Sequence, residues 1–88
     1  MEIRNLITFV RIAEVQSFSK TAEQLGYSQS AVTMQIKQLE AELHRQLFER
    51  IGKQVKLTQA GERLLPYALE ILNSVRKAES IIQEPEEI

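Results

Sequence analysis

The sequence predicts a mainly α-helical domain in which three short helices are followed by a two-stranded β-hairpin and one long C-terminal helix. Apolar residues recur at spacings of three and four in three segments, which is the period of a helix with one buried face, and capping residues mark a fourth, shorter helix. Around residues 54–57 apolar and polar residues alternate instead, as they do in a half-buried strand. With 88 residues and no cysteine, the chain can form one modest core without disulfide support.

The first helix is predicted over about residues 3–15, because apolar residues at positions 3, 6, 10 and 13 share one face. A short second helix is predicted over residues 20–25. Ser19 offers a hydroxyl that can cap its first turn, and Gly26 tolerates the left-handed conformation that commonly ends a helix.

The third helix is predicted over about residues 29–43, with Ser28 as its N-cap. Its apolar residues fall in one narrow sector of a helical wheel: Val32, Ile36, Leu39 and Leu43. The opposite face carries Ser30, Thr33, Met34, Lys37 and Ala41. No acidic residue occurs between Glu23 and Glu40, although the chain holds 12 acidic and 11 basic residues.

A β-hairpin is predicted next, with Gly52 and Lys53 in its turn and with Val55 and Leu57 on its inner side. Residues 50–61 contain no acid and three bases, which are Arg50, Lys53 and Lys56. Charge is uneven along the chain, because residues 1–61 hold eight bases and six acids whereas residues 62–88 hold three and six. The net positive charge therefore lies in the first part.

The last helix can be capped by Thr58 and is expected to end at Pro85, with a bend at the interior Pro66. One apolar stripe has coiled-coil spacing and contains Leu64, Ala68, Ile71, Val75, Ala78 and Ile82. A second stripe beside it contains Leu65, Leu69 and Leu72. Either both stripes cover the domain's own core, or a partner helix covers part of them. We expect a homodimer, because so small a body leaves apolar surface uncovered.

The second and third helices, joined by a tight turn, suit a helix-turn-helix: Ala22 permits close crossing, Gly26 takes the turn and Val32 packs beneath both. A helix that enters the major groove of DNA must lack carboxylates on its leading face, whereas Gln, Ser and Thr bond base edges and Met contacts a thymine methyl. The acid-free face of the third helix is therefore suited to contact double-stranded DNA. The alternative is that it is the solvated outer face of an ordinary helix. The hairpin would make a wing with basic residues beside the groove, or else a solvated turn.

Five motifs agree in register with one protein family: S-F-S-x-x-A-x-x-L, S-Q-x-A-V-[ST], I-x-x-L-E, L-F-x-R and L-T-x-A-G. Through them nearly the whole chain resembles the N-terminal DNA-binding domain of LysR-type transcriptional regulators. The resemblance implies a sequence-specific winged helix-turn-helix that binds a two-fold operator as a homodimer, with the third helix in the major groove and the wing at the flanking groove. Residues 1–58 would form this domain. Residues 59–88 would form the linker and dimerisation helix and the start of the connection to an effector domain. That domain is absent from this fragment, so no small-molecule effector is expected for the fragment.

The resemblance also implies roles for single residues. The residues that would contact base edges are Gln29, Ser30, Thr33 and Met34. The residues that would contact the DNA backbone are Lys20, Thr21, Ser28, Lys37, Arg50 and Lys53. The apolar stripes of the last helix, rather than the resemblance, predict the dimerisation residues, which are Leu64, Ala68, Ile71, Leu72, Val75, Ala78 and Ile82. Three positions depart from the family: Ser30 replaces a common proline, Met34 a common arginine, and His44 the glycine that usually ends the helix. Without that arginine a bidentate guanine reader is lost, so the family's base preference does not carry over.

Two other functions fit parts of the sequence. A winged-helix regulator of another type, such as the molybdate-responsive one, would share the fold, and a helical protein-interaction module would suit the near-neutral net charge of -1. An enzyme, a cofactor and a metal site are not expected, because the chain has no Asp, no Cys, no glycine-rich phosphate loop and only His44 as histidine. Charged residues interrupt the apolar pattern of the first twenty positions, so neither a signal peptide nor a membrane span is expected, and the protein should be cytoplasmic.

Overall fold

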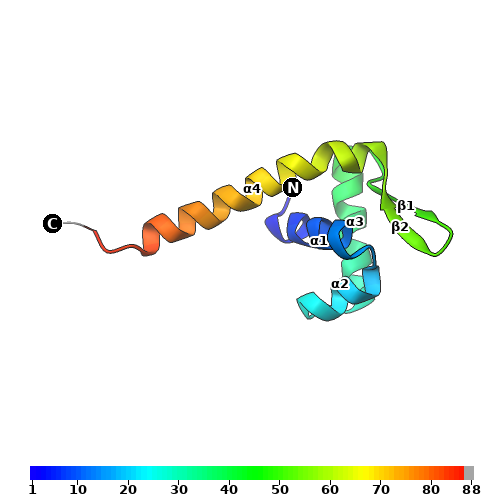
Figure 1. The fold of residues 1–88 in the computed structure, drawn as a ribbon, viewed down its shortest axis with the longest axis horizontal. Coiled ribbons are helices and arrows are strands. Elements are labelled where there is room, and N and C mark those ends of the chain that lie inside the picture. Colours follow the sequence, from blue (N-terminus) through cyan, green and yellow to red (C-terminus); the bar gives the residue numbers. More distant parts are fainter. Residues whose placement is uncertain (87–88) are drawn as a thin grey trace.

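A computed structural model describes residues 1–86 and contains four helices and one hairpin in that range. The elements are α1 (Ile3–Val15), α2 (Phe18–Leu25), α3 (Gln29–Leu43), β1 (Phe48–Ile51), β2 (Gln54–Leu57) and α4 (Gln59–Gln83). The first three helices form a body from which the hairpin projects, and α4 crosses this body and extends away from it (Figure 1). The predicted winged helix-turn-helix with a long last helix is confirmed. Residues 87 and 88, the end of the predicted 59–88 segment, lie outside the described part.

Helix α2 begins two residues earlier than predicted. Ser17, not Ser19, is its N-cap, and the Ser17 hydroxyl accepts a hydrogen bond from the Lys20 amide at 3.1 Å. The earlier start brings Phe18 into the helix, where its ring packs edge-on against Phe48 with 5.8 Å between ring centroids. Burial of this aromatic ring favours the longer helix, a contact that local capping rules do not include.

The turn between α2 and α3 is as tight as predicted. Gly26 ends α2 in the left-handed region with φ 76°, and Ser28 caps α3 by accepting a hydrogen bond from the Ala31 amide at 3.1 Å. At the other end of α3, His44 adopts φ 56° and its amide bonds carbonyl groups of the last turn. A histidine therefore holds the left-handed position where glycine is the favoured residue.

The core is one hydrophobic cluster to which all four helices and β2 contribute buried side chains. Strand β1 contributes half-buried Phe48, which packs against this cluster. The largest fully buried apolar side chains of the cluster are Leu6, Phe9, Ile12, Val32, Leu39 and Leu47. Ala68 of α4 is also completely buried in this cluster. The division predicted after residue 58 therefore marks the start of α4, whereas the core continues into the first half of that helix.

A compact junction links the hairpin to α4. Strands β1 and β2 pair antiparallel, with Ile51 opposite Gln54 across the two-residue turn. Thr58 caps α4 by accepting from the Gly61 amide at 3.1 Å, and its amide donates to the Leu47 carbonyl at 3.0 Å. Helix α4 then runs through Pro66 as one continuous helix and ends before Pro85.

Candidate nucleic-acid interface

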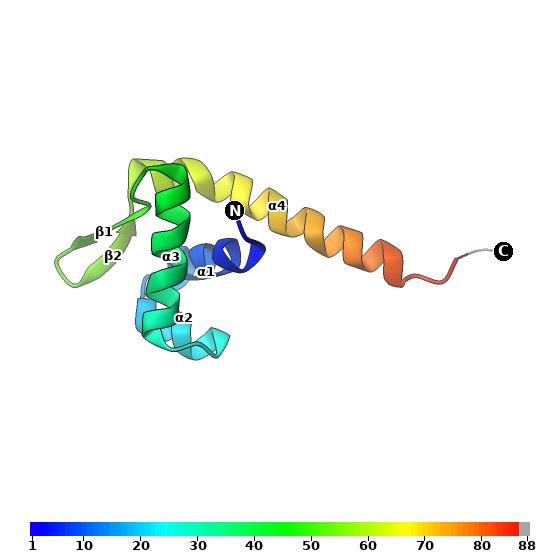
Figure 2. The ribbon, with the colours of Figure 1, turned by 180° about the vertical axis from the view of Figure 1, so that it is seen from behind.

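The outer face of α3 is open to solvent and lies beside the hairpin on the side of the molecule shown in Figure 2. Gln29, Ser30 and Lys37 are exposed on it, Thr33 is half-buried, and Met34 is 70% exposed. Ser28 is also exposed, but its hydroxyl is occupied as the N-cap and lies 3.1 Å from the Ser30 hydroxyl. The structure thus brings the four predicted base-reading residues together on one accessible surface.

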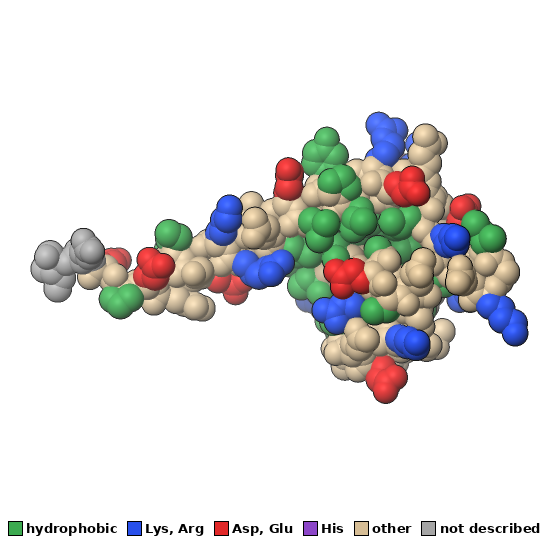
Figure 3. Space-filling view, viewed as in Figure 1, with side chains coloured by type: hydrophobic (Ala, Val, Ile, Leu, Met, Phe, Trp, Pro, Cys, Tyr) green, Lys and Arg blue, Asp and Glu red, His purple; other side chains and the backbone are tan. Residues whose placement is uncertain are grey.

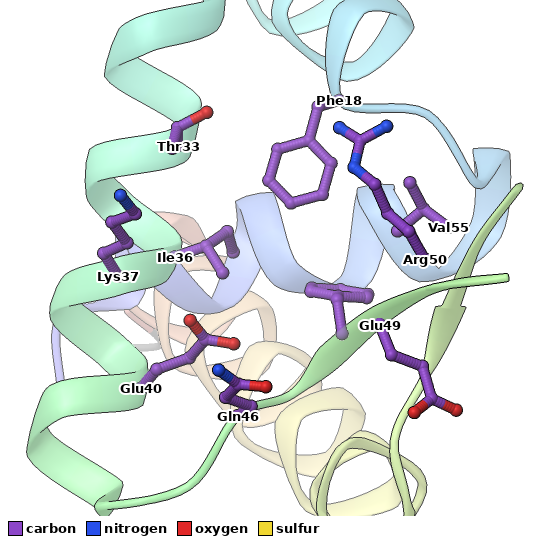
Figure 4. Close-up of a pocket in the computed structure, with 10 residues that line it drawn as sticks. Phe18, Thr33, Ile36, Lys37, Glu40, Gln46, Glu49, Arg50 and Val55 are labelled. Carbon is purple, nitrogen blue, oxygen red and sulfur yellow. The ribbon is translucent and has the colours of Figure 1, made fainter. Parts of the chain in front are cut away.

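A cleft of about 250 Å³ separates α3 from the hairpin (Figure 4). Its apolar lining includes Phe18 and Ile36, while Lys37 stands on the α3 wall and Arg50 on the hairpin wall. Two carboxylates, of Glu40 and Glu49, also line the cleft, and in Figure 4 they lie toward the end away from Thr33. The positive charge of the cleft is therefore flanked by acid on one side only.

A second hollow lies where the starts of α2 and α3 meet the hairpin. Its polar lining consists of Gln16, Ser17, Ser19, Gln29, Arg50 and Lys53. Lys20 is exposed in the first turn of α2. Within residues 1–86, no carboxylate lies within ion-pair distance of Lys20, Lys37, Arg50 or Lys53, since the ion pairs found there involve Met1, Arg4 and Arg11. These four cations are available to an anionic partner.

Thr21 differs from its predicted role as a DNA-backbone contact. Its side chain is completely buried, and its hydroxyl has no hydrogen-bond partner among the described residues. Thr21 and Ala22 both turn inward because α2 packs that side against α1 and α3. Burial is incompatible with a phosphate contact, so we leave Thr21 out of the interface.

The predicted dimerisation stripe on α4 divides into two parts. Ala68 is 0% exposed and therefore cannot contact a partner, which corrects the prediction for this residue. Leu64, Ile71 and Leu72 are half-buried against the protein's own core. Val75 is half-buried, whereas Ala78 is exposed and Ile82 is 82% exposed. The repeat identifies the apolar face of α4, but the first half of that face is covered by the same chain.

An apolar groove runs between α1 and the middle of α4, and Figure 3 shows hydrophobic side chains gathered where these helices cross. Its apolar lining is Ile3, Ile7, Val10, Leu69, Leu72 and Val75. Two bases, Arg11 and Arg76, and two acids, Glu14 and Glu79, line it as well. The groove thus combines an apolar floor with balanced charge.

The sequence patterns did not indicate how α3 is fixed to the body. The Thr8 hydroxyl donates to Gln35 Oε1 at 2.5 Å, Asn5 Nδ2 donates to Gln38 Oε1 at 3.2 Å, and the Leu47 amide donates to Glu40 Oε2 at 2.7 Å. A signal was present in α1, where polar residues at positions 5 and 8 interrupt the buried face of the helix. Such polar residues need a buried partner.

In the part of the chain that the structure describes, no cluster of three or more His, Cys, Asp or Glu side chains is arranged to bind a metal ion. None of the helices described combines the length and apolar character needed to cross a lipid bilayer.

Residues 3–62 match the family model described as "Bacterial regulatory helix-turn-helix protein, lysR family". The chain is 51% identical over 73 residues to the HTH-type transcriptional regulator CitR of Bacillus subtilis (strain 168). The aligned residues make up 83% of this chain and 25% of CitR. The chain spans 25–28% of the length of three curated relatives that it matches, CitR among them.

Two solved structures with DNA are similar in both sequence and fold. The BenM DBD in complex with catB site 1 DNA has a TM-score of 0.89 and 40% identity, over 94% of this chain and 93% of that one. Full-length CbnR in complex with its target DNA has a TM-score of 0.87 and 34% identity, over 94% of this chain and 29% of that one.

Proposed function

The chain belongs to the LysR family of bacterial regulatory helix-turn-helix proteins, and we propose that its α3 and hairpin bind double-stranded DNA in a sequence-specific way. The family match favours this function over the DNA-binding half of a molybdate-responsive regulator. The observation that carries the proposal is the acid-free outer face of α3 beside a cleft whose walls present Lys37 and Arg50 without carboxylate partners in the described residues. The similarity to BenM and CbnR, both solved with DNA, supports it.

In the proposed complex, α3 enters the major groove and the hairpin reaches the flanking groove. Amide and hydroxyl groups of Gln29, Ser30 and Thr33 bond base edges, and Met34 contacts a thymine methyl or a sugar. One DNA strand passes along the cleft between Lys37 and Arg50, while Glu40 and Glu49 repel phosphate from its other end. Lys20 and Lys53 complete the backbone contacts, together with the Ser28 hydroxyl, which accepts from the Ala31 amide and can donate its own proton to a phosphate oxygen.

The contribution of Lys37 can be separated from general charge by a matched control. Log affinity for DNA should fall with log salt by about 0.9 per neutralised phosphate, and Lys37→Ala should reduce this slope by about 0.9. Lys77→Ala removes the same charge from the exposed face of α4 and should leave the slope unchanged. Fluorescence anisotropy with a labelled duplex measures both. A flat salt profile for the unaltered protein would favour a protein-interaction module.

We also propose that two copies associate through α4 to bind a two-fold operator. The occupant of the exposed stripe is a second copy of the chain, because the groove beside it carries two bases and two acids and so meets its own copy without net repulsion. The end of α4 supports the same proposal. Residues after Val75 extend beyond the body with Ala78 and Ile82 exposed, so only a partner can bury the apolar side chains of this end.

Charged substitutions at the exposed end of α4 test this association. Glu at both Ala78 and Ile82 should shift the protein to monomer, because charge would be buried in the contact. Glu at Asn73 and Ser80 adds the same charge on the opposite side of the helix and should leave the dimer intact. Sedimentation velocity distinguishes the two outcomes, and an unaltered protein that is monomeric at high micromolar concentration would refute the dimer.

The remaining properties follow from the family. We propose a transcription regulator that acts in the cytoplasm, where bacterial DNA lies, without enzymatic activity and without a cofactor, in keeping with relatives named as transcriptional regulators. Residues 1–58 would contribute the DNA-reading surface. Residues 59–88 would serve as the dimerisation helix and as the link toward an effector domain.

A further inference from the structure

We propose that hydrogen bonds on both flanks of α3 fix its rotation about its own axis, and that Thr8 of α1 is a positioning residue for base recognition. The inference rests on the proposed function of α3 as the helix that reads DNA. Thr8 itself is completely buried and contacts α3 from behind, so it is not a DNA contact.

Apolar packing restrains the rotation of α3 less sharply than a hydrogen bond does, because it has no preferred direction. The buried residues of α3 are Val32, Ile36 and Leu39, which occupy one narrow sector with half-buried Leu43. Apolar burial has no directional preference, so a small roll changes it little. Side-chain tips lie about 5–6 Å from a helix axis, and a roll of about 15° therefore moves them by about 1.5 Å. Such a displacement exceeds the tolerance of a hydrogen bond to a base edge.

On one flank, α1 supplies the restraint. The Thr8 hydroxyl donates to Gln35 Oε1 at 2.5 Å, and one turn further along α3 the Asn5 amide donates to Gln38 Oε1 at 3.2 Å. Both α1 residues are 0% exposed, so water does not compete at the donor. Asn5 Oδ1 has no partner within the described residues, which makes the Thr8 bond the better test of the two.

On the other flank, the base of the hairpin supplies the restraint. Glu40 Oε2 accepts a hydrogen bond from the Leu47 amide at 2.7 Å. Glu40 lies five residues after Gln35, about 140° around the helix at about 100° per residue. A roll in either direction must therefore stretch a hydrogen bond on one flank, and such bonds weaken quickly with distance and angle.

The two classes of DNA contact respond differently to a roll. Long lysine and arginine side chains can follow a phosphate over 1–2 Å, roughly the displacement expected, whereas short Ser and Thr side chains cannot follow a base edge. Loss of the restraint should therefore lower discrimination between sequences and leave non-specific affinity in place. A purely structural defect would instead lower both, because it reduces the folded fraction.

The experiment compares Thr8→Val, which keeps the branched shape but removes the donor, with two controls. Thr8→Ser keeps the hydroxyl, and Ile12→Val removes a buried methyl group from the same helix without touching the hydrogen bonds to α3. Each protein is titrated with a selected operator and with a scrambled duplex of equal length. For Thr8→Val the ratio of the two affinities should fall at least about fivefold, the discrimination that one well-placed base contact supplies. Scrambled-duplex affinity and the salt slope should not change.

Thr8→Ser and Ile12→Val should keep the ratio of the unaltered protein. The inference is overturned when folded Thr8→Val keeps that ratio, or when Ile12→Val lowers it equally. Gln35→Met removes the acceptor instead of the donor, and it gives the same comparison when Thr8→Val does not fold.

A measurement without DNA separates this inference from the proposed function. Residual dipolar couplings of α3 amides in the free protein report its orientation relative to α1. Thr8→Val should rotate α3 or widen its range of orientations, and unchanged couplings would refute the restraint. A third outcome is that α3 loosens in Thr8→Val although the unaltered protein binds no DNA. This outcome would refute the proposed function and the role of Thr8 in base recognition, but the restraint on α3 would stand.

Discussion

Replacing Gly61 by alanine should destabilise the domain, although alanine is the better helix former. Gly61 is buried in the first turn of α4, against the loop before β1 and against β2. A Cβ atom at this position would clash with the Leu47 carbonyl oxygen and lie 2.8 Å from Leu57 Cδ2. The oxygen cannot move away freely, because it accepts a hydrogen bond from the Thr58 amide at 3.0 Å.

The size of the effect follows from two opposing contributions. Overpacking costs about 1–3 kcal/mol, and a clash with a held backbone oxygen belongs near the top of that range. Alanine recovers about 1 kcal/mol of helix propensity relative to glycine. The net loss is about 2 kcal/mol, which lowers the melting temperature of a domain of this size by about 8–16 °C.

Thermal unfolding followed by circular dichroism measures this loss. All samples need the same protein concentration, because dissociation of a dimer would also shift the transition. Gln59→Ala changes an exposed residue of the same turn and should alter the free energy of unfolding by no more than about 0.5 kcal/mol. A melting temperature that rises in Gly61→Ala would show that the close approach of α4 to Leu47 does not exist.

Two further substitutions address α3. Met34→Arg, at a position 70% exposed on the outer face, should tighten DNA binding and shift preference toward G·C at one position of each half-site by about 1–3 kcal/mol, as compared by selection on both proteins. Higher affinity with unchanged base preference would mean that residue 34 meets only the DNA backbone. His44→Gly should raise the free energy of unfolding by about 1 kcal/mol in urea titrations, because residue 44 adopts φ 56°, and a decrease would contradict this reasoning.

Periodicity was sufficient to predict α1, α3, α4 and the hairpin, whereas α2 was predicted from its capping residues. Apolar spacing identifies a helix face whatever its surroundings, and Gly26 and Ser28 define the tight turn chemically. The start of α2 was predicted wrongly because Ser17 and Ser19 are equivalent caps at the level of local sequence. The choice between them depends on contact of Phe18 with Phe48, thirty positions away in sequence.

The candidate site was predictable as a face but not residue by residue. Family resemblance assigned Thr21 to the DNA backbone, yet only the fold reveals that α2 turns this side chain inward. Ala68 illustrates the same limit, because a repeat of apolar residues defines a surface without defining what covers it. The restraints from Thr8 and Glu40 join distant segments through single hydrogen bonds, so a polar residue on the buried face of α1 indicates that Thr8 needs a partner but does not identify that partner.

Selection of bound sequences from random double-stranded DNA, with the unaltered protein, tests the central claim most directly. A dimer that reads DNA through α3 should enrich one motif made of two half-sites related by two-fold symmetry, with centres about 34–36 Å or a multiple of that apart along the duplex. Enrichment of a single half-site without a symmetric partner would contradict the dimeric arrangement. Recovery of DNA without any common motif would contradict sequence recognition by this face of α3.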